Sequence, residues 1–241
     1  MSFRFRQFSI DDDRSTMKVG TDAVLLGSWA GRGMPSGVLE IGTGCGVISL
    51  MLAQRFPAAQ VLAIDIHGPS VQQAGENFGR SSWAARLQAE ACSLQELAQR
   101  QPPAAYDLIV SNPPYFSNAL LPPDNSKKLA RHTGKLTFGE LAGGVAGLLK
   151  PDGLFALILP SGSQEAFELE ALRQGLHKLR ELADEPFLLR EVGSGSRHII
   201  DEHMQASGVH LKVRLSLASN EAFRELVARG ANPSGGRLWT R

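Results

Sequence analysis

The chain has 241 residues, of which 43% are hydrophobic and 20% charged, the balance of a globular protein that buries a sizeable core. Its 25 Lys and Arg residues oppose 24 Asp and Glu residues, so any surface that binds nucleic acid must be local. The two cysteines lack metal-site spacing, no apolar run approaches the roughly 20 residues of a membrane span, and the N-terminus lacks the apolar stretch of a signal peptide. We therefore expect a cytoplasmic protein that binds neither a metal nor a membrane.

The first 36 residues are expected to form a lead-in that packs on the main domain. Rings and guanidinium groups alternate over Phe3–Arg6, which predicts a strand with both rings on one face, packed onto the protein. Thr21 is expected to cap a helix over Asp22–Trp29, because threonine is a favoured helix-capping residue.

From residue 37 onwards, short apolar runs of strand length alternate with helical patterns. This alternation is typical of βαβ units and predicts an α/β fold with a mostly parallel sheet. Strands are expected at 38–41, 61–64, 86–91, 106–110 and 154–159, and helices at 47–55, 70–78, 94–101 and 138–149. Pro151 and Gly153 are expected to form the turn before the last of these strands, and residues 116–135 a polar loop.

The pattern is weaker after residue 160. A helix is expected at 163–175, strands within 177–190, 197–204 and 209–217, and a short helix near 220–229. Residues 231–241 are rich in Gly, Pro and Ser and are expected to form a flexible tail. The main domain is thus expected to span residues 37–230.

A glycine-rich turn follows the first strand of the main domain, in the sequence Glu40-Ile-Gly42-Thr-Gly44-Cys-Gly46. Glycine allows a sharp bend and lets a ligand approach the backbone where a Cβ atom would block it. Asp65 closes the next strand 19 residues later, where its carboxylate can accept hydrogen bonds from ribose hydroxyls. The third glycine comes one residue too early for a dinucleotide-binding G-x-G-x-x-G, and no P-loop Lys-Ser/Thr follows. The alternative is a tight turn without a ligand.

An acid, three alternating glycines and a second acid at the end of the next strand resemble the motif of S-adenosylmethionine-dependent methyltransferases. The resemblance implies a Rossmann-like class I fold, with a mostly parallel seven-stranded sheet and helices on both faces. It also implies that Glu40 lies beside the methionine end of S-adenosylmethionine and that Asp65 holds the ribose. The product would be S-adenosylhomocysteine.

Asn112-Pro113-Pro114-Tyr115 follows the fourth expected strand, which the two prolines terminate. In a doubly wound sheet the first and fourth strands are neighbours, so their carboxyl ends place Asn112 beside the glycine turn. A planar amine is a poor nucleophile. The side-chain oxygen of Asn112 and the carbonyl of Pro113 are expected to accept its two hydrogens and favour a positively charged nitrogen. Tyr115 is expected to stack on a base; the alternative is a rigid turn with a core tyrosine.

The segment after Tyr115 contains several basic residues and no acid between Asn125 and Gly139. It follows the expected amine clamp directly, so it would lie over the mouth of the site. Its basic residues are expected to contact phosphates that flank a target base, and a solvated surface loop is the alternative. These residues are Lys127, Lys128 and Arg131.

Four motifs of the chain occur in the order found in the bacterial tRNA(Val) adenine-37 N6-methyltransferase family. They are residues 14–29, the glycine turn, Ser111–Tyr115 and Ala130-Arg-His-Thr133. The chain resembles this family over about residues 3–160. The family's distinctive lead-in is Met-Lys-Val-Gly-Thr-Asp at 17–22, which the resemblance places against the methionine part of the cofactor. Many relatives end the third strand with an acid that contacts the cofactor's adenine, whereas this chain has Ala91-Cys92-Ser93. The implied cofactor contacts are Lys18, Gly20, Thr21, Glu40, Gly42, Gly44, Gly46, Asp65, Ile66 and Asn112.

Together these motifs predict an enzyme that methylates N6 of an adenine in tRNA, and the family implies adenine 37 of tRNA(Val). The motifs do not define the oligomeric state, for which a monomer is favoured. A base in the anticodon loop is already unpaired and easily splayed out. The alternative is a protein glutamine N5-methyltransferase of the release-factor type, because a glutamine amide is also a planar NH2. Such enzymes usually carry a helical N-terminal domain, for which the residues before Glu40 are too few. An intact glycine turn and clamp argue against a third possibility, a catalytically silent RNA-binding relative.

Overall fold

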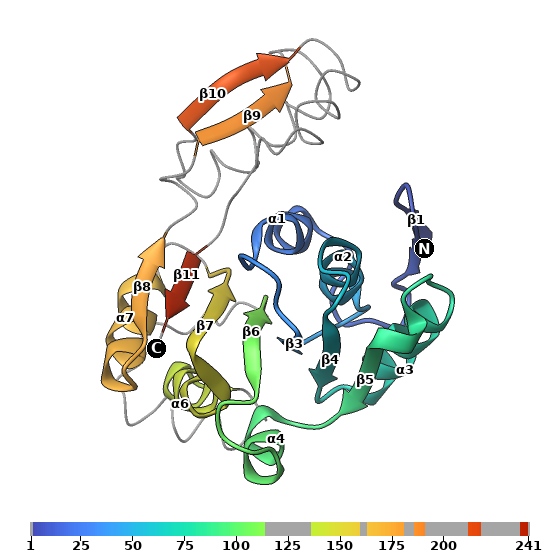
Figure 1. Cartoon of the computed structure of the whole chain (residues 1–241). Coiled ribbons are helices and arrows are strands. Elements are labelled where there is room, and N and C mark those ends of the chain that lie inside the picture. The colour runs from blue at the N-terminus through green and yellow to red at the C-terminus, as the bar shows by residue number, and fades with distance from the viewer. Residues whose placement is uncertain are drawn as a thin grey trace.

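The computed structural model describes residues 2–113, 136–159, 163–180, 186–190, 212–217 and 237–240. Within them, strands and helices alternate along the chain (Figure 1). The elements are β1 (Ser2–Arg4), β2 (Ser9–Asp11), α1 (Thr21–Trp29), β3 (Gly37–Ile41), α2 (Val47–Arg55), β4 (Gln60–Asp65), α3 (Gly68–Gly79), the short 3-10 helix η1 (Ala84–Arg86), β5 (Leu87–Ala91), α4 (Leu94–Arg100), β6 (Tyr106–Ser111), α6 (Phe138–Leu148), β7 (Leu149–Leu157), α7 (Gln164–Arg173), β8 (His177–Arg180), β9 (Pro186–Arg190), β10 (Lys212–Leu217) and β11 (Arg237–Thr240).

The main sheet has the strand order β5-β4-β3-β6-β7-β11-β8. The five strands from β5 to β7 are parallel to their neighbours, which confirms the mostly parallel α/β fold expected from the sequence. The direction of winding reverses between β3 and β6, where Ile41 pairs with Ser111. In such a sheet the carboxyl ends of the two strands at the reversal form the usual binding crevice.

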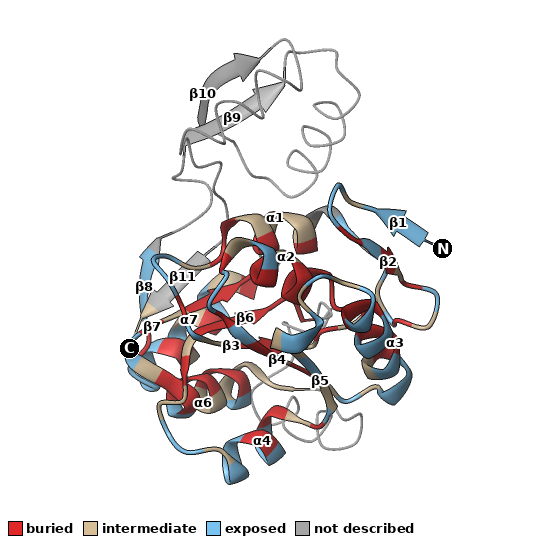
Figure 2. Cartoon of the chain, turned by 45° about the vertical axis from the view of Figure 1, so that its right-hand side comes forward, coloured by how far each residue is buried: buried red, intermediate tan, exposed pale blue. Residues whose placement is uncertain are grey.

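Helices cover both faces of the sheet, and successive strand residues point to opposite sides. Val38 of β3 packs in a core with residues of α1, α2 and α3, whereas Leu39 packs in a second core with residues of α4, α6 and α7. Buried residues fill the sheet and the inner faces of the helices on both sides (Figure 2). Among the described residues no helix is long and apolar enough to cross a bilayer.

Three local expectations are wrong. Helix α1 begins at Thr21 itself and its N-cap is Gly20, without a side-chain cap. Strand β7 begins at Leu149 and contains the expected turn at Pro151–Gly153; its pairing with β6 shifts there, so the extra residues bulge out of the ladder. Residues 237–240 of the expected flexible tail form β11, which pairs antiparallel with both β7 and β8.

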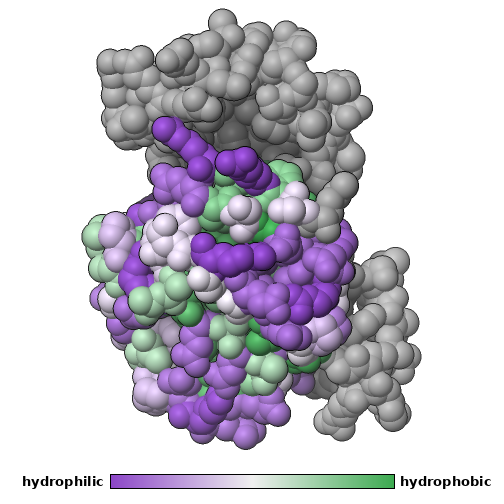
Figure 3. Space-filling view, turned by 90° about the vertical axis from the view of Figure 1, so that its right-hand side faces the viewer, coloured by the Kyte–Doolittle hydropathy of each residue, from purple (hydrophilic) through white to green (hydrophobic). Residues whose placement is uncertain are grey.

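The strand expected at Phe3–Arg6 is β1, which ends at Arg4 and pairs antiparallel with β2. The Phe3 and Phe5 rings are 5.1 Å apart, and Phe5 stacks on Phe8 at 4.5 Å, so the rings gather on one face as expected. Phe8 in turn meets Trp83 after α3. Figure 3 looks onto this side of the molecule, where hydrophilic side chains surround scattered hydrophobic ones.

Strands β8, β9 and β10 fall within the ranges expected after residue 160, and α7 within the helix expected at 163–175. β9 and β10 pair in parallel as a separate two-stranded sheet. The strand expected at 197–204, the helix near 220–229 and the polar loop at 116–135 lie outside the described residues.

Candidate functional site

The turn after β3 requires its glycines. Gly42, Gly44 and Gly46 have φ values of 77°, 55° and 84°, in the left-handed region that other residues rarely adopt. A Cβ on Gly46 would lie 2.4 Å from the Phe78 ring of α3, whereas a Cβ on Gly42 would meet no heavy atom within 4 Å. Gly46 is thus needed for packing, and Gly42 leaves open space above the backbone.

Glu40 is the second-last residue of β3, directly before the glycine turn. Its side chain faces α2 and is 1% exposed. Its Oε2 atom accepts hydrogen bonds from the Thr43 hydroxyl at 2.8 Å, the Ser49 amide at 3.0 Å and the Ser49 hydroxyl. Its Oε1 atom is buried and has no hydrogen-bond partner among the described residues. Burial raises the pKa of Glu40 to about 7, against the lowering effect of these hydrogen bonds.

Asp65 lies at the carboxyl end of β4 and is tied to the glycine turn. Its Oδ2 accepts from the Gly44 amide and its Oδ1 from the His67 amide, both at 2.9 Å. These bonds fix the carboxylate while leaving each oxygen a further lone pair. The next residue, Ile66, follows β4 at the carboxyl end of the sheet, and its apolar side chain is 67% exposed.

Asn112 follows β6 directly and lies beside the glycine turn, as the topology predicted. The preceding Ser111 donates its hydroxyl to the Ile41 carbonyl at 2.9 Å, which joins the carboxyl ends of β6 and β3. Asn112 is 9% exposed, and its Oδ1 atom is buried without a hydrogen-bond partner among the described residues. Pro113 is the last residue described before the gap. Four predicted contacts lie outside the described residues: Tyr115, Lys127, Lys128 and Arg131.

The predicted lead-in contacts are Lys18, Gly20 and Thr21. Lys18 donates to the Asp12 carbonyl, and its Nζ lies 3.8 Å from the Asp12 carboxylate, while Asp12 also accepts from the Val19 amide at 3.2 Å. The loop between Asp12 and Val19 is therefore closed on itself. Gly20 follows it as the N-cap of α1.

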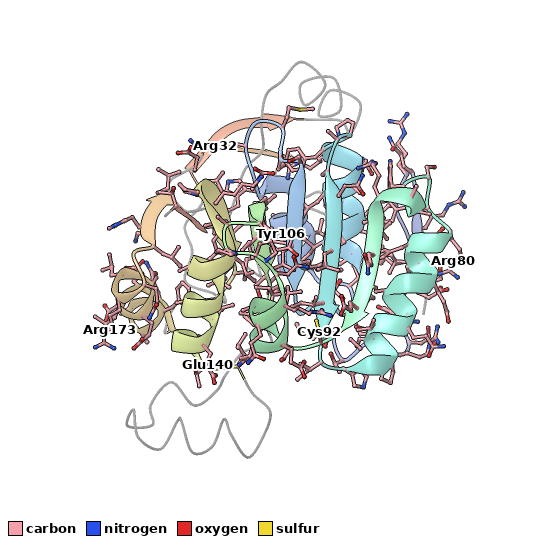
Figure 4. The ribbon with its side chains drawn as sticks, turned by 60° about the horizontal axis from the view of Figure 1, so that its bottom comes forward. Arg32, Arg80, Cys92, Tyr106, Glu140 and Arg173 are labelled. Carbon is pink, nitrogen blue, oxygen red and sulfur yellow. The ribbon has the colours of Figure 1, made fainter. Side chains whose placement is uncertain are left out.

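The segment that replaces the family's adenine-contacting acid is engaged in local structure. Ser93 caps α4 through a capping box in which Glu96 accepts from both its amide, at 2.8 Å, and its hydroxyl, at 2.9 Å. Cys92 is buried, its pKa is raised by that burial, and Arg100 donates to its sulfur at 3.2 Å. Cys92 and Glu140 lie toward the same end of the sheet, and Arg32 lies at the opposite end (Figure 4).

Sequence reasoning missed a set of polar residues that hold this site together. They are Thr43, Ser49, Ser15, Ser70, Gln73 and Asn77. The last three are spaced by three and four residues along α3, a periodicity that marks one helix face and that the sequence does show. No group of three metal-ligating side chains occurs in the part of the chain that the structure describes.

A shallow hollow at the opposite end of the sheet does not contain this chemistry. Its lining includes Arg32, Met34, Asp107 and Asp152. Asp107 is already bonded by Lys150 and by the Ser36 and Gly37 amides, so its role there is structural.

Residues 19–135 match the model of the methyltransferase small domain family. A second model, the LysR substrate binding domain, matches residues 163–232, most of which lie outside the described part of the chain.

The chain is similar over most of its length to curated bacterial proteins. A tRNA1(Val) (adenine(37)-N6)-methyltransferase from Phocaeicola vulgatus is 42% identical over 198 residues, covering 82% of this chain and 81% of the relative. The protein of the same name from Serratia proteamaculans is 42% identical over 181 residues, covering 75% and 69%. A crystal structure described as a predicted O-methyltransferase from Agrobacterium tumefaciens covers 88% of this chain and 98% of its own, with a TM-score of 0.51 and 16% identity, a likeness of fold alone.

Proposed function

Because the chain belongs to the family of tRNA1(Val) (adenine(37)-N6)-methyltransferases, we propose that it transfers a methyl group from S-adenosylmethionine to N6 of an adenine in tRNA. The relatives' names point to adenine 37 of tRNA1(Val) as the target. A tRNA substrate favours the cytoplasm as the compartment of the reaction. The observation that carries the proposal is the buried, unpartnered side-chain oxygen of Asn112 beside an open glycine turn.

The residues of the turn fit S-adenosylmethionine. The open side of Gly42 leaves room for a ligand against the backbone, and the unpartnered oxygen of Glu40 complements a cationic group such as the ammonium of the methionine part. Asp65 is positioned to accept hydrogen bonds from the ribose hydroxyls, with Ile66 exposed beside it as an apolar surface for the adenine. Lys18, Gly20 and Thr21 of the lead-in and Gly44 and Gly46 of the turn complete the proposed cofactor site.

Asn112 and Pro113 form the proposed amine clamp. Bound S-adenosylmethionine supplies a methyl group on a positively charged sulfur. The adenine N6 has its lone pair delocalised into the ring, so the side-chain oxygen of Asn112 and the carbonyl of Pro113 would accept its two hydrogens and favour the pyramidal, charged nitrogen. The Ser111–Ile41 hydrogen bond holds the clamp next to the glycine turn, so the adenine N6 and the methyl group of the cofactor would be held close together.

The proposed contacts to tRNA follow the clamp along the chain. Tyr115 would stack on the target base, a contact worth about 1–3 kcal/mol. Lys127, Lys128 and Arg131 would bind the flanking phosphates. With a net charge of only +1, the chain needs such a local cluster to bind tRNA.

The substrate is tested by incubating the protein with methyl-labelled S-adenosylmethionine and either unmodified total tRNA or release factor. Labelled N6-methyladenosine in the nucleoside digest of the tRNA supports the proposal. Label on the release factor alone would replace it with glutamine N5 methylation, and no transfer to either would leave a silent RNA-binding relative.

Asn112→Ala tests the clamp. We expect a loss of about 100-fold or more in turnover, because an acceptor for the developing charge is removed. The dissociation constant for S-adenosylhomocysteine, measured by calorimetry, is expected to remain nearly unchanged. Equal loss of turnover and of cofactor affinity would move Asn112 from the amine to the cofactor.

A further inference from the structure

Helix α3 carries a buried polar face made of Ser70, Gln73 and Asn77, each at most 1% exposed. This face binds the backbone of the lead-in. Asn77 accepts from the Asp11 amide at 3.0 Å and donates to the Asp11 carbonyl at 2.8 Å. It also donates to the Cys45 carbonyl at 2.8 Å, so one side chain joins the lead-in to the glycine turn.

Gln73 fixes the next residues of the lead-in. Its side-chain oxygen accepts from the Arg14 amide at 2.8 Å and from the Ser15 amide at 3.0 Å, and its amide nitrogen donates to the Asp13 carboxylate at 2.8 Å. All of these partners lie about 60 positions away in the sequence. The backbone at Ser15 is therefore held in one place by α3.

The Ser15 hydroxyl lies against the glycine turn and makes no hydrogen bond to the described residues. Ser15 is 8% exposed, and its Oγ atom is buried with no hydrogen-bond partner among the described residues. Oγ lies 3.0 Å from the position that a Cβ on Gly44 would occupy. A buried hydroxyl without a hydrogen bond is costly, so a rigid support that holds one against Gly44, two residues from the open Gly42, points to a missing ligand.

We propose that the Ser15 hydroxyl donates a hydrogen bond to the carboxylate of the amino-acid half of S-adenosylmethionine. This proposal rests on the function proposed above. The group has a proton to donate and no acceptor among the described residues, and the ligand carries one carboxylate. Asp65, which binds the Gly44 amide, is an acceptor and suits the ribose hydroxyls instead. Gln73 is a positioning residue for Ser15.

Calorimetric titration of Ser15→Ala with two ligands tests this assignment. S-adenosylhomocysteine contains the amino-acid half, whereas 5′-methylthioadenosine keeps the adenosine half and lacks it. We expect the dissociation constant for S-adenosylhomocysteine to rise about tenfold to a hundredfold, as for a hydrogen bond to a charged group, with no change for 5′-methylthioadenosine. The midpoint of thermal unfolding without ligand is expected to stay the same or rise, because the hydroxyl removed has no partner.

Ser81→Ala is the matched control, because the Ser81 hydroxyl, beyond the far end of α3, is already bonded to the Phe78 carbonyl. It is expected to leave both affinities unchanged. Equal weakening of both ligands by Ser15→Ala would assign the residue to the adenosine half, and unchanged affinity for both would remove it from the site; either result overturns the proposal. Failure of the unsubstituted protein to bind S-adenosylhomocysteine would instead overturn the proposed function.

Discussion

Glu40, in β3 just before the glycine turn, makes the stability of the protein depend on pH. Its pKa lies near 7 because burial disfavours the charged form more than the hydrogen bonds from Ser49 and Thr43 favour it. In the unfolded chain the same group has a pKa of 4.5. Its contribution to stability is therefore complete below pH 4.5 and is lost as the pH rises toward and through 7.

Glu40→Gln removes this titration while keeping a side chain of the same shape. We expect the difference in free energy of unfolding, variant minus unsubstituted protein, to increase between pH 5 and pH 8 by at most about 3 kcal/mol. Urea denaturation of both proteins across this range measures the difference, and histidine titrations common to both cancel. A difference that does not change with pH would show that Glu40 is charged throughout.

The residues predicted from local motifs and those found only in the structure differ in a physical way. Asp65 ends β4 and Asn112 directly follows β6, so the strand pattern and the sheet topology were enough to place them beside the glycine turn. Ser15 and Gln73 meet across 58 positions of sequence, and no local signal says which buried polar side chains will pair over such a distance. Their contact depends on how the lead-in lies along α3.

At the scale of elements, the missing side chain of Gly46 lets the start of α2 pack closely against α3. Gly46 is the N-cap of α2 with φ of 84°, and a Cβ there would overlap the Phe78 ring of α3 at 2.4 Å. Gly42 has a similar φ of 77° but open space around its Cβ position. An alanine at Gly42 would therefore introduce backbone strain alone, whereas an alanine at Gly46 would introduce the same strain and a clash with α3.

Gly46→Ala is expected to destabilise the protein more than Gly42→Ala. Both variants force a non-glycine residue into the left-handed region, at about 1–3 kcal/mol, and only the first also displaces Phe78. Midpoints of thermal unfolding give the comparison. Gly42→Ala is the variant expected to weaken S-adenosylhomocysteine binding out of proportion to its loss of stability. Equal loss of stability in the two variants would contradict this account of the packing.

The elements that sequence patterns missed depend on their neighbours in the sheet. Residues 237–240 of the expected flexible tail form β11 because β7 and β8 offer them hydrogen-bonding partners on both sides, which the Gly, Pro and Ser content of the tail does not reveal. β7 continues through Pro151 and Gly153 as a bulge where local composition predicts a turn. Strands β3, β4, β6 and the second half of β7 were predictable because each contains an apolar run bounded by turn residues, whereas β5, in which apolar and polar residues alternate, gives a weaker pattern.

At the scale of the whole molecule, the two ends of the sheet are used differently. The carboxyl ends of β3 and β6 carry the unpartnered oxygens of Glu40 and Asn112, and Asp65 ends β4 between the glycine turn and His67. The opposite end carries Asp107, which accepts from the Ser36 hydroxyl at 2.8 Å, the Gly37 amide at 2.8 Å and Lys150 at 2.7 Å. These bonds join the starts of β3, β6 and β7, so one end of the sheet is satisfied while the other is left available to ligands.

Asp107 is expected to govern stability in acid. Burial opposes its ionisation, but the bonds from Lys150, Gly37 and Ser36 together lower its pKa below the unfolded value of 3.8. The stability it contributes is therefore present above pH 3.8 and is lost as the pH falls through its lower folded pKa. Asp107→Asn is expected to unfold at lower urea concentration than the unsubstituted protein at pH 7, with the difference shrinking as the pH falls below 4. Asp152→Asn, which changes an exposed carboxylate at the same end of the sheet, is the control and is expected to leave the midpoint unchanged. A deficit of Asp107→Asn that persists undiminished at pH 3 would show that the carboxylate acts by its shape and hydrogen bonds and not by its charge.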